Sequence, residues 1–344
     1  MIFVLNRFAH SAFGLATAVK EFAAVVPEPY LRARTVEQDL LDGSNLREID
    51  AGEVAARKGD AWHVDDLFAP FCLAMIARGL VSGRTVIICP HGMLDGWAMN
   101  NGRTRFKRAA LHLIDMLARG RSLVIHALNP DEARDAKRYL PHAARIEVVP
   151  NGVPSDILEI RESLPPRSQR EGPIVIGCMS RIAPKKNQLA VVELAARMRD
   201  LRPETFAKVE FRIDGQVEDE DYAHGVRDRI AAEGLGDKVA LGGNVPFEQR
   251  AGCLSGYDYF LFPSKSEGMP YVVLEAMALG VTPVVADTAC CDFVRDYGGK
   301  VFGSLDDGVK LFPAARSDMV GVDVDRFLAD FDTRKLRDFL GDYR

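Results

Sequence analysis

The sequence predicts an α/β protein built from two parallel-sheet domains. Three observations support this prediction: the chain has 344 residues, short apolar runs alternate with helical patterns, and one polar segment interrupts the alternation. A chain of this length exceeds one ordinary hydrophobic core, so two domains are expected. Strands that alternate with helices form parallel sheets, because each helix carries the chain back to the start of the next strand.

The expected strands are brief, apolar and bounded by glycine, proline or polar residues, as strands covered on both faces are. They are residues 84–89, 122–127, 145–149, 173–178, 208–213, 238–241, 257–262 and 282–286. The pattern of residues 25–60 is hard to interpret, and the elements there are left open.

Helices are expected between these strands. Residues 186–201 place apolar side chains at near-helical spacing, and a helix through residues 274–279 ends at a glycine. Asn129 is a candidate N-cap, with a proline in the first turn and Glu132 three residues after the cap, which is the spacing of a capping box. A final helix is expected over residues 324–343.

One polar segment divides the chain. Residues 154–173 hold two consecutive prolines, three arginines and no strand pattern, which is typical of a linker. The predicted division is a front domain of residues 1–155, a linker of residues 156–172, a rear domain of residues 173–320 and a C-terminal helix in residues 321–344.

Composition excludes several classes of protein. The net charge of −5 argues against nucleic-acid binding, which requires a basic surface. No apolar run approaches the roughly 18 residues of a membrane-spanning helix, and residues 1–5 lack the basic start and long apolar stretch of a secretion signal. The six cysteines show no C-x-x-C spacing, so we expect reduced thiols in a cytoplasmic protein.

A loop after residues 173–178 is the first part of a candidate site. It carries Arg181 and Lys186 toward a helix start. Five residues apart, they can approach one anion from either side of the turn, and both side chains suit phosphate oxygens. The helix start adds partial positive charge. The alternative is a solvated basic turn.

A second loop, after residues 257–262, adds two carboxylates. Glu267 ends a stretch of small residues, and Glu275 follows eight residues later. If a helix begins near residue 270, Glu275 lies about one turn into it and faces the same cleft, at the carboxyl ends of the strands. The alternative is a charge at a helix start for Glu267 and an ordinary helix surface for Glu275.

The same helix start offers backbone donors. The amides of Met269, Tyr271 and Val272 would lie where N–H groups have no partner within the helix. Such amides can hold sugar hydroxyls or a phosphate. Cations and carboxylates on neighbouring loops therefore predict a polar clamp for a phosphorylated sugar.

Three stretches resemble the GT4-type glycosyltransferases, retaining enzymes of GT-B fold in which two Rossmann-like domains face a cleft. Residues 90–95 (PHGMLD) resemble a front-domain loop of members that make bacterial polysaccharides, and residues 149–153 (VPNGV) resemble the strand end before the interdomain linker. Residues 263–280, with Glu267 and Glu275, match the E-x7-E signature. The resemblance spans about residues 85–300, with order and spacing in agreement throughout.

The resemblance implies a role for each candidate residue. Glu267 and His91 would be the catalytic residues, with His91 reaching the donor sugar from the front, acceptor-side domain. The implied donor site comprises Arg181, Lys186, Tyr271 and Val272 at the diphosphate, Glu267, Gly268, Met269 and Glu275 at the sugar and ribose, and Val245 at the base. In relatives the final helix packs back on the front domain, and the mixed charge pattern here leaves that open.

The resemblance also implies the chemistry. A sugar would move from a nucleoside-diphosphate donor to a saccharide or lipid-linked acceptor, in polysaccharide biosynthesis, through an oxocarbenium-like centre. The leaving phosphate would take the acceptor's proton on the same face, which retains configuration. Because no His–carboxylate cluster has metal-ligand spacing, neither a metal nor another cofactor is expected.

Two departures leave alternatives open. The front domain is short, and residues 10–14 replace the expected Gly-rich loop, so a non-catalytic relative that binds a nucleotide sugar or scaffolds a complex stays a candidate. The basic run of residues 103–108 is either a solvated helix face or a contact to anionic lipid at the inner face of the membrane.

A nicotinamide-dependent oxidoreductase is disfavoured, because no G-x-G-x-x-G follows a strand.

Overall fold

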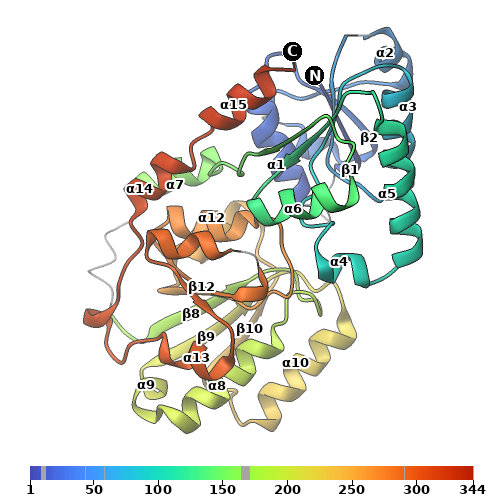
Figure 1. The fold of residues 1–344 in the computed structure, drawn as a ribbon. Coiled ribbons are helices and arrows are strands. Elements are labelled where there is room, and N and C mark those ends of the chain that lie inside the picture. Colours follow the sequence, from blue (N-terminus) through green and yellow to red (C-terminus); the bar gives the residue numbers. More distant parts are fainter. Residues whose placement is uncertain (9–12, 43, 58, 164–170, 290, 344) are drawn as a thin grey trace. The chain divides into compact units, whose positions relative to one another are not determined.

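The computed structural model describes the chain apart from residues 9–12, 43, 58, 164–170, 290 and 344. Most of the segment in place of the Gly-rich loop, residues 10–12, lies outside the described residues. The chain divides into two compact units, one of Met1–Gly152 with Phe331–Arg344 and one of Val153–Asp330. Each unit is built on one parallel sheet (Figure 1).

The sheet of the first unit has the order β3-β2-β1-β4-β5-β6-β7, and all neighbouring strands are parallel. Its strands are β1 (Ile2–Phe8), β2 (Tyr30–Val36), β3 (Arg47–Glu48), β4 (Trp62–Val64), β5 (Val86–Ile88), β6 (Leu123–Ala127) and β7 (Arg145–Val148). Its helices are α1 (Phe13–Ala24), α2 (Ala51–Ala56), α3 (Pro70–Val81), α4 (Gly96–Asn100), α5 (Thr104–Ala118), α6 (Pro130–Tyr139) and α15 (Arg334–Gly341).

The sheet of the second unit has the order β10-β9-β8-β11-β12-β13, again with parallel neighbours. Its strands are β8 (Ile174–Met179), β9 (Val209–Asp214), β10 (Val239–Gly243), β11 (Tyr259–Phe262), β12 (Thr282–Ala286) and β13 (Lys300–Phe302). Its helices are α7 (Ser155–Ser163), α8 (Leu189–Leu201), α9 (Pro203–Ala207), α10 (Glu220–Ala232), α11 (Arg250–Ser255), α12 (Tyr271–Ala278), α13 (Leu305–Lys310) and α14 (Val324–Asp330).

Both sheets reverse their winding at an internal point. In the second unit this point lies between β8 and β11, which pair directly although β9 and β10 separate them in the sequence. Helix α8 packs with α10 and α13, whereas α12 packs with α7, α11 and α14. The helices that follow β8 and β11 thus belong to different packing groups, an arrangement in which ligands bind at the carboxyl ends of the two strands.

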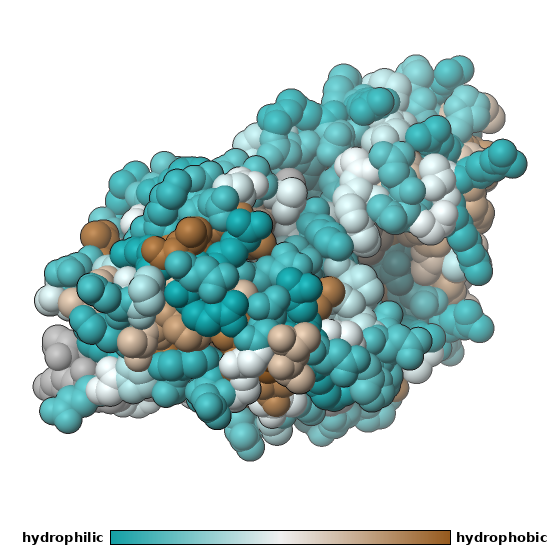
Figure 2. Space-filling view, turned by 90° about the horizontal axis from the view of Figure 1, so that it is seen from below, coloured by the Kyte–Doolittle hydropathy of each residue, from teal (hydrophilic) through white to brown (hydrophobic). Residues whose placement is uncertain are grey.

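Each unit has its own apolar core. Ile176, Phe211 and Tyr259 lie at the centre of the second core, and Val4, Trp62 and Ile88 lie in the first. On the face seen in Figure 2, hydrophilic residues predominate and apolar residues form small groups. The five cysteines that the structure describes are free thiols.

The structure contains all eight expected strands, with ends that differ by at most two residues. In the segment left open, residues 25–60, it forms β2, β3 and α2. Helix α7 occupies the first half of the segment expected to be a linker. These strands were predictable because a buried parallel strand is recognisable from its own composition.

Two expected helix boundaries are wrong. The helix expected from residue 186 begins at Leu189, because Asn187 takes a left-handed conformation (φ 58°) that a helix cannot continue through. The expected helix over residues 324–343 is two helices, α14 and α15. The Asp332 carboxylate accepts a hydrogen bond from the Arg334 N–H (2.8 Å), which starts α15 as a separate helix.

The capping box expected at Asn129 is half formed. The Asn129 side chain accepts from the Glu132 N–H (2.8 Å), as an N-cap should. The Glu132 carboxylate does not accept a hydrogen bond from the backbone N–H of Asn129, which a capping box requires. It accepts from the N–H groups of Leu128 (2.7 Å) and Gly92 (2.5 Å), because it is buried between the loops that follow β5 and β6.

Candidate functional site

The loop after β8 is held in shape by one buried side chain. Gln188 is fully buried, and its amide donates to the Ser180 hydroxyl (2.9 Å) and to the Arg181 carbonyl (2.8 Å). The Lys186 N–H closes a turn on the Ala183 carbonyl (2.9 Å). Lys186 therefore lies in a rigid turn just before α8, at the carboxyl end of its strand.

The loop after β11 carries a carboxylate in a cationic setting. Lys186 Nζ lies 2.6 Å from Glu267 Oε1, and the Ser264 hydroxyl donates to the same oxygen (2.5 Å). The two ion-paired side chains are only 14% and 12% exposed. Burial would raise the pKa of Glu267, but the charges of Lys186 and Lys185 and these hydrogen bonds lower it below its usual value.

The two loops are tied together by their backbones as well. Lys265 N–H donates to the Lys185 carbonyl (2.9 Å), and the Asn187 amide donates to the Pro263 carbonyl (3.2 Å). The left-handed conformation of Asn187 allows this contact. The pair of Lys186 and Glu267 therefore lies at the winding reversal between β8 and β11, where ligands of such sheets bind.

Arg181 is placed differently. Its guanidinium pairs with Glu218, in the loop after β9, and both side chains are about half exposed. The structure therefore brings Lys186 to Glu267 and gives Arg181 another partner. An exposed ion pair of this kind contributes little to stability, so it leaves the guanidinium available to a phosphate.

Glu275 is a buried carboxylate on the first turns of α12. Its Oε1 lies 3.1 Å from Arg250 Nε, and another guanidinium nitrogen of Arg250 lies 2.6 Å from Asp156 Oδ2. The Glu275 side chain is 3% exposed. Burial raises its pKa, and the neighbouring Arg250 charge only partly opposes this. Glu275 thus has an environment unlike that of Glu267.

The remaining donor-site residues lie near these carboxylates in sequence. Helix α12 begins at Tyr271, and its N-cap residue Pro270 makes no side-chain capping bond. Gly268, Met269 and Tyr271 are buried, and Val272 is half-buried. The half-buried Val245 follows β10. A cavity of about 250 Å³ lies beside the carboxyl ends of β9 and β10, lined by Ile182, Gly215, Val217, Arg227, Leu241 and Gly243.

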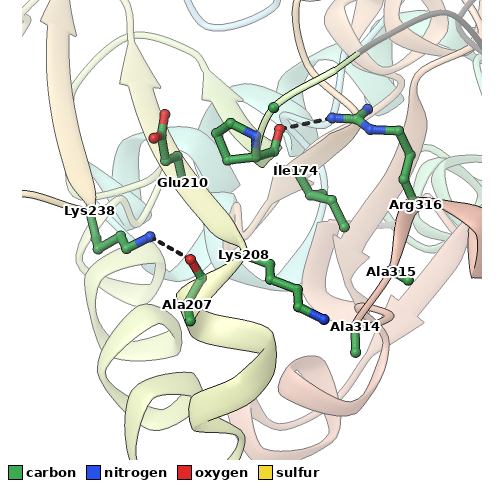
Figure 3. A pocket seen from close by; sticks show the side chains of 10 residues that line it. Ile174, Ala207, Lys208, Glu210, Lys238, Ala314, Ala315 and Arg316 are labelled. Atoms are coloured by element: carbon green, nitrogen blue, oxygen red, sulfur yellow. Dashed lines mark hydrogen bonds between the residues drawn. The ribbon is translucent and has the colours of Figure 1, made fainter.

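A larger cavity, of about 460 Å³, lies at the opposite end of the same strands, where β8, β9 and β10 begin. Its lining comes from residues at the starts of β8 and β9, from residues just before β8, β9 and β10, and from residues 314–316. In Figure 3, Lys238 points to the Ala207 carbonyl (3.0 Å) and Arg316 bonds to the Pro173 carbonyl (2.8 Å). Lys238 and Arg316 thus bind backbone carbonyls, and none of the predicted site residues lines this cavity.

His91 lies in the first unit, in the loop after β5. Its backbone is left-handed (φ 49°), which is uncommon for a residue other than glycine and is found where a side chain must be aimed. The Glu132 carboxylate anchors the next residue, Gly92. His91 Nε2 lies 2.9 Å from Asp65 Oδ1, and its side chain is 12% exposed.

Sequence reasoning missed several residues at these places. Asp65, His63 and Glu132 surround His91, and Gln188 and Arg250 hold the residues of the second unit. The sequence His63-Val64-Asp65 contained a usable signal, since alternate residues of a strand share a face. The partners of Arg250 are Glu275 on α12 and Asp156 on α7, which lie far from it in the sequence and leave no local pattern.

The described part of the chain contains one group of potential metal ligands. Atoms of Asp65, Cys89 and His91 lie within 4.8 Å of one another. Burial and nearby carboxylates raise the pKa of the Cys89 thiol well above its usual value, which disfavours the thiolate that binds metals. Asp65 is already hydrogen-bonded to two histidines. We therefore assign no metal to this group.

Asp-x-Asp is a common metal-binding pattern. In two such sequences of this chain, one aspartate has a structural role, as a helix cap or in an ion pair. In residues 219–221, Asp219 caps α10 by accepting from the Tyr222 N–H (2.9 Å). In residues 323–325, Asp325 pairs with Arg161 (3.4 Å). Among the helices of the described residues, none is long and apolar enough to cross a membrane.

Comparisons with known proteins agree with this arrangement. Residues 160–304 match a family model described as glycosyl transferases group 1, and residues 15–152 match one described as glycosyl transferase 4-like domain. A GDP-mannose-dependent alpha-(1-6)-phosphatidylinositol monomannoside mannosyltransferase from Mycolicibacterium smegmatis is 26% identical over 230 residues, 63% of this chain. The match spans 56% of that relative.

Solved structures share the fold. Anabaena HepE, in complex with UDP and glucose, has a TM-score of 0.72 at 15% identity, covering 99% of this chain and 98% of HepE. A glycosyltransferase from Rickettsia africae has a TM-score of 0.71 at 14% identity, covering 99% and 97%. With the two parallel sheets, these likenesses confirm the predicted fold class.

Proposed function

Because the chain belongs to the GT4-type glycosyltransferases of GT-B fold, we propose that it is a retaining, metal-independent hexosyltransferase. It transfers a sugar from a nucleoside-diphosphate donor to a saccharide or lipid-linked acceptor in polysaccharide biosynthesis. The observation that carries this proposal is the pair of Lys186 and Glu267, on loops joined at the winding reversal of the second sheet. It places a cation and a carboxylate together where such sheets bind ligands.

In this proposal the cations act on the leaving group. Lys186 and Arg181 neutralise the diphosphate, with the backbone amides of Tyr271 and Val272 at the start of α12. Charge develops on the leaving oxygens as the anomeric bond breaks, so fixed donors there stabilise the transition state. The weak, exposed partner of Arg181 supports this role, because a diphosphate can displace Glu218 at little cost.

The carboxylates act on the sugars. Glu267, beside Gly268 and Met269, contacts the donor sugar where positive charge develops, and its lowered pKa keeps it ionised for that purpose. Glu275 binds the ribose hydroxyls. His91 contacts the donor sugar, and the backbone at Val245 contacts the base, beside the small cavity at β9 and β10.

The leaving phosphate takes the acceptor's proton on the same face of the sugar, which accounts for retention without a nucleophile–base pair. The proposal assigns no role to a metal. Relatives differ in donor base, since the mannosyltransferase is named for GDP-mannose and HepE was solved with UDP, so both bases are candidates here.

A peripheral location at the inner face of the membrane is part of the proposal. Helix α5 exposes Phe106, Leu113 and Met116, at 41%, 51% and 45%. Residues 103–108 supply basic side chains at its start. Apolar and basic groups on one helix suit an anionic lipid surface, where a lipid-linked acceptor would lie.

Substitutions at the ion pair test the proposal. We expect Glu267→Gln to bind nucleoside diphosphate normally and to lose roughly 100-fold or more in turnover, since it acts on the transition state. We expect Lys186→Ala to weaken binding by about 1–3 kcal/mol, as for charged hydrogen bonds. Calorimetry with nucleoside diphosphates and assays of donor hydrolysis and transfer measure both effects.

The matched control is Glu204→Gln, an exposed carboxyl on α9 of the same unit, which should change neither quantity. Wild-type turnover by Glu267→Gln would contradict its catalytic role. A wild-type protein that binds nucleotide sugars but never cleaves them would favour the non-catalytic alternative.

A further inference from the structure

A series of hydrogen bonds runs from His91 into the core of the first unit. His91 Nε2 lies 2.9 Å from Asp65 Oδ1, and Asp65 Oδ2 lies 2.9 Å from His63 Nδ1. His63 Nε2 lies 3.1 Å from His126 Nδ1, and His126 Nε2 lies 2.9 Å from the Val149 carbonyl oxygen. Of the four side chains, only His91 is partly exposed, and the other three are fully buried.

The hydrogen bond from His126 to the Val149 carbonyl determines which ring nitrogens of the series carry protons. A carbonyl oxygen only accepts, so His126 Nε2 holds a proton and donates to Val149. A neutral imidazole holds one proton, which leaves the lone pair on Nδ1 of His126. His63 Nε2 must therefore donate to that lone pair. Burial lowers the pKa of His126 to about 3, so this ring is neutral at physiological pH.

The next hydrogen bond requires one more proton. His63 Nδ1 faces Asp65, and a carboxylate oxygen cannot donate, so His63 Nδ1 also holds a proton. Burial alone would raise the pKa of Asp65, but the His63 charge and the hydrogen bonds from His63 and His91 lower it below its usual range. The arrangement is then a buried His63 imidazolium beside an Asp65 carboxylate.

The near end of the series acts on His91. The second oxygen of the Asp65 carboxylate accepts from His91 Nε2, which leaves the lone pair of a neutral His91 on Nδ1. Aromatic packing adds to the placement, since the Phe22 ring stacks on the His91 ring at 6.3 Å and meets His63 at 5.3 Å. The ring is thus held in one orientation and one tautomer.

We propose that Asp65, neutralised by a His63 imidazolium that His126 anchors to the backbone of Val149, is a positioning residue that presents His91 Nδ1 as an acceptor for a hydroxyl of the donor sugar. This rests on the proposed function, because it takes the sugar contact of His91 from there. Asp65, His63 and His126 never touch the sugar and act through His91.

The charged pair can be measured without any assay of activity. In ¹⁵N-edited NMR of the wild-type protein, we expect both ring nitrogens of His63, but only one of His126, to carry protons at pH 7 to 8. A single protonated nitrogen on His63 at that pH would overturn the proposal. This measurement needs no variant and so does not depend on whether a variant folds.

Asp65→Asn is the informative variant, because every hydrogen bond can then form without a charge. The new amide N–H donates to His63 Nδ1 and its carbonyl accepts from His91 Nε2. We expect His63 to lose one ring proton while the His91 tautomer stays the same. With a weaker partner for His91, we expect kcat to fall roughly tenfold or more and the donor KM to change little.

Asp115→Asn is the matched control. Asp115 holds His142 in the same unit by a similar bond (2.7 Å between Asp115 Oδ2 and His142 Nδ1) that does not involve His91. It should leave kcat and the His63 protons unchanged. Unchanged kcat in Asp65→Asn would overturn the positioning role. If the wild-type protein transfers no sugar, the proposed function fails, and the NMR measurement still decides the protonation of the series.

Discussion

Glu267 and Glu275 are identical side chains eight residues apart, yet their surroundings move their pKa values in opposite directions. Burial favours the protonated form of both. At Glu267, two lysines and the Ser264 hydroxyl outweigh burial and lower the pKa. At Glu275, the single Arg250 guanidinium does not, and the pKa is raised. The difference suits a charged contact to a reacting sugar at one position and hydrogen bonding to a ribose at the other.

A pH dependence follows for Glu267. Its folded pKa is below the usual 4.5, so its contribution to stability is fully present above pH 4.5 and is lost as pH falls through the folded pKa. We expect Glu267→Gln to lower the free energy of unfolding by about 2 kcal/mol at pH 7, as for a charged hydrogen bond. The difference from wild type should shrink below pH 4.5. Urea unfolding at pH 7, 5 and 3 measures it.

Glu204→Gln is again the control, because Glu204 is exposed and should give no difference at any of these pH values. A difference for Glu267→Gln that stays constant from pH 7 to pH 3 would contradict the ion pair with Lys186.

At the scale of elements, α15 shows how a distant segment completes a core. This helix is at the end of the chain, yet it belongs to the first unit. Its residues Leu336, Phe339 and Leu340 are buried, and the Phe339 ring lies 4.9 Å from the His126 ring. Tyr343, just after the helix, bonds to Arg145 on β7 (3.1 Å). The C-terminal segment thus lies against His126 of β6 and Arg145 of β7.

We expect Phe339→Ala to destabilise the first unit by about 3–5 kcal/mol, because it removes a buried aromatic ring and leaves a cavity. Urea unfolding followed by circular dichroism measures this loss. Arg337→Ala, on the exposed side of the same helix, is the control and should change stability by less than about 0.5 kcal/mol. Equal effects of the two substitutions would show that α15 does not pack as described.

At the scale of the whole molecule, one sheet pattern occurs twice. In both units the first strand of the sheet pairs with the second and fourth, so the winding reverses beside it. In the second unit that reversal carries the loops of Lys186 and Glu267. In the first, β4 carries His63, and Asp65 and His91 follow β4 and β5. The chemically distinctive residues of each unit therefore gather at the carboxyl ends of its strands, as in other doubly wound sheets.

Ligand binding should be visible in the stability of the whole chain. A nucleoside diphosphate at 100 times its Kd should stabilise the folded protein by about 2.7 kcal/mol by mass action. We expect UDP or GDP, but not both equally, to raise the melting temperature, which identifies the donor base. Lys186→Ala should require a higher concentration for the same shift. Absence of any shift with every nucleoside diphosphate would count against the proposed donor site.

Much of the fold could be predicted because its signals are local. The eight expected strands were recognisable from their own apolar residues, and Asn129 caps α6 as its sequence indicates. Boundaries were less accurate where one backbone angle decided them, as at Asn187. The break between α14 and α15 coincides with a hydrogen bond to the Asp332 side chain. The mixed charge pattern of this segment did not indicate where one helix ends and the next begins.

For the candidate site as well, the sequence predicted the positions of some residues but not their partners. Sequence placed Lys186 and Glu267 on loops at strand ends and Glu275 about one turn into the helix that follows, as the structure shows. It did not reveal that Arg181 pairs with Glu218 or that Glu275 depends on Arg250. It also missed His63 and His126, because a histidine in a strand has the same local sequence signal whether or not it meets another histidine.

The sequence by itself determined eight of the strands, the family of the chain and the positions of Lys186 and Glu267 after two of those strands, because these depend on neighbours along the chain. Only the tertiary structure decided which charged side chains form ion pairs with one another. Two identical carboxyls received opposite pKa shifts, and a buried series of side chains came to hold His91. The physical reason is that burial and pairing depend on groups from separate elements, whose distances are set only when the sheets and helices pack.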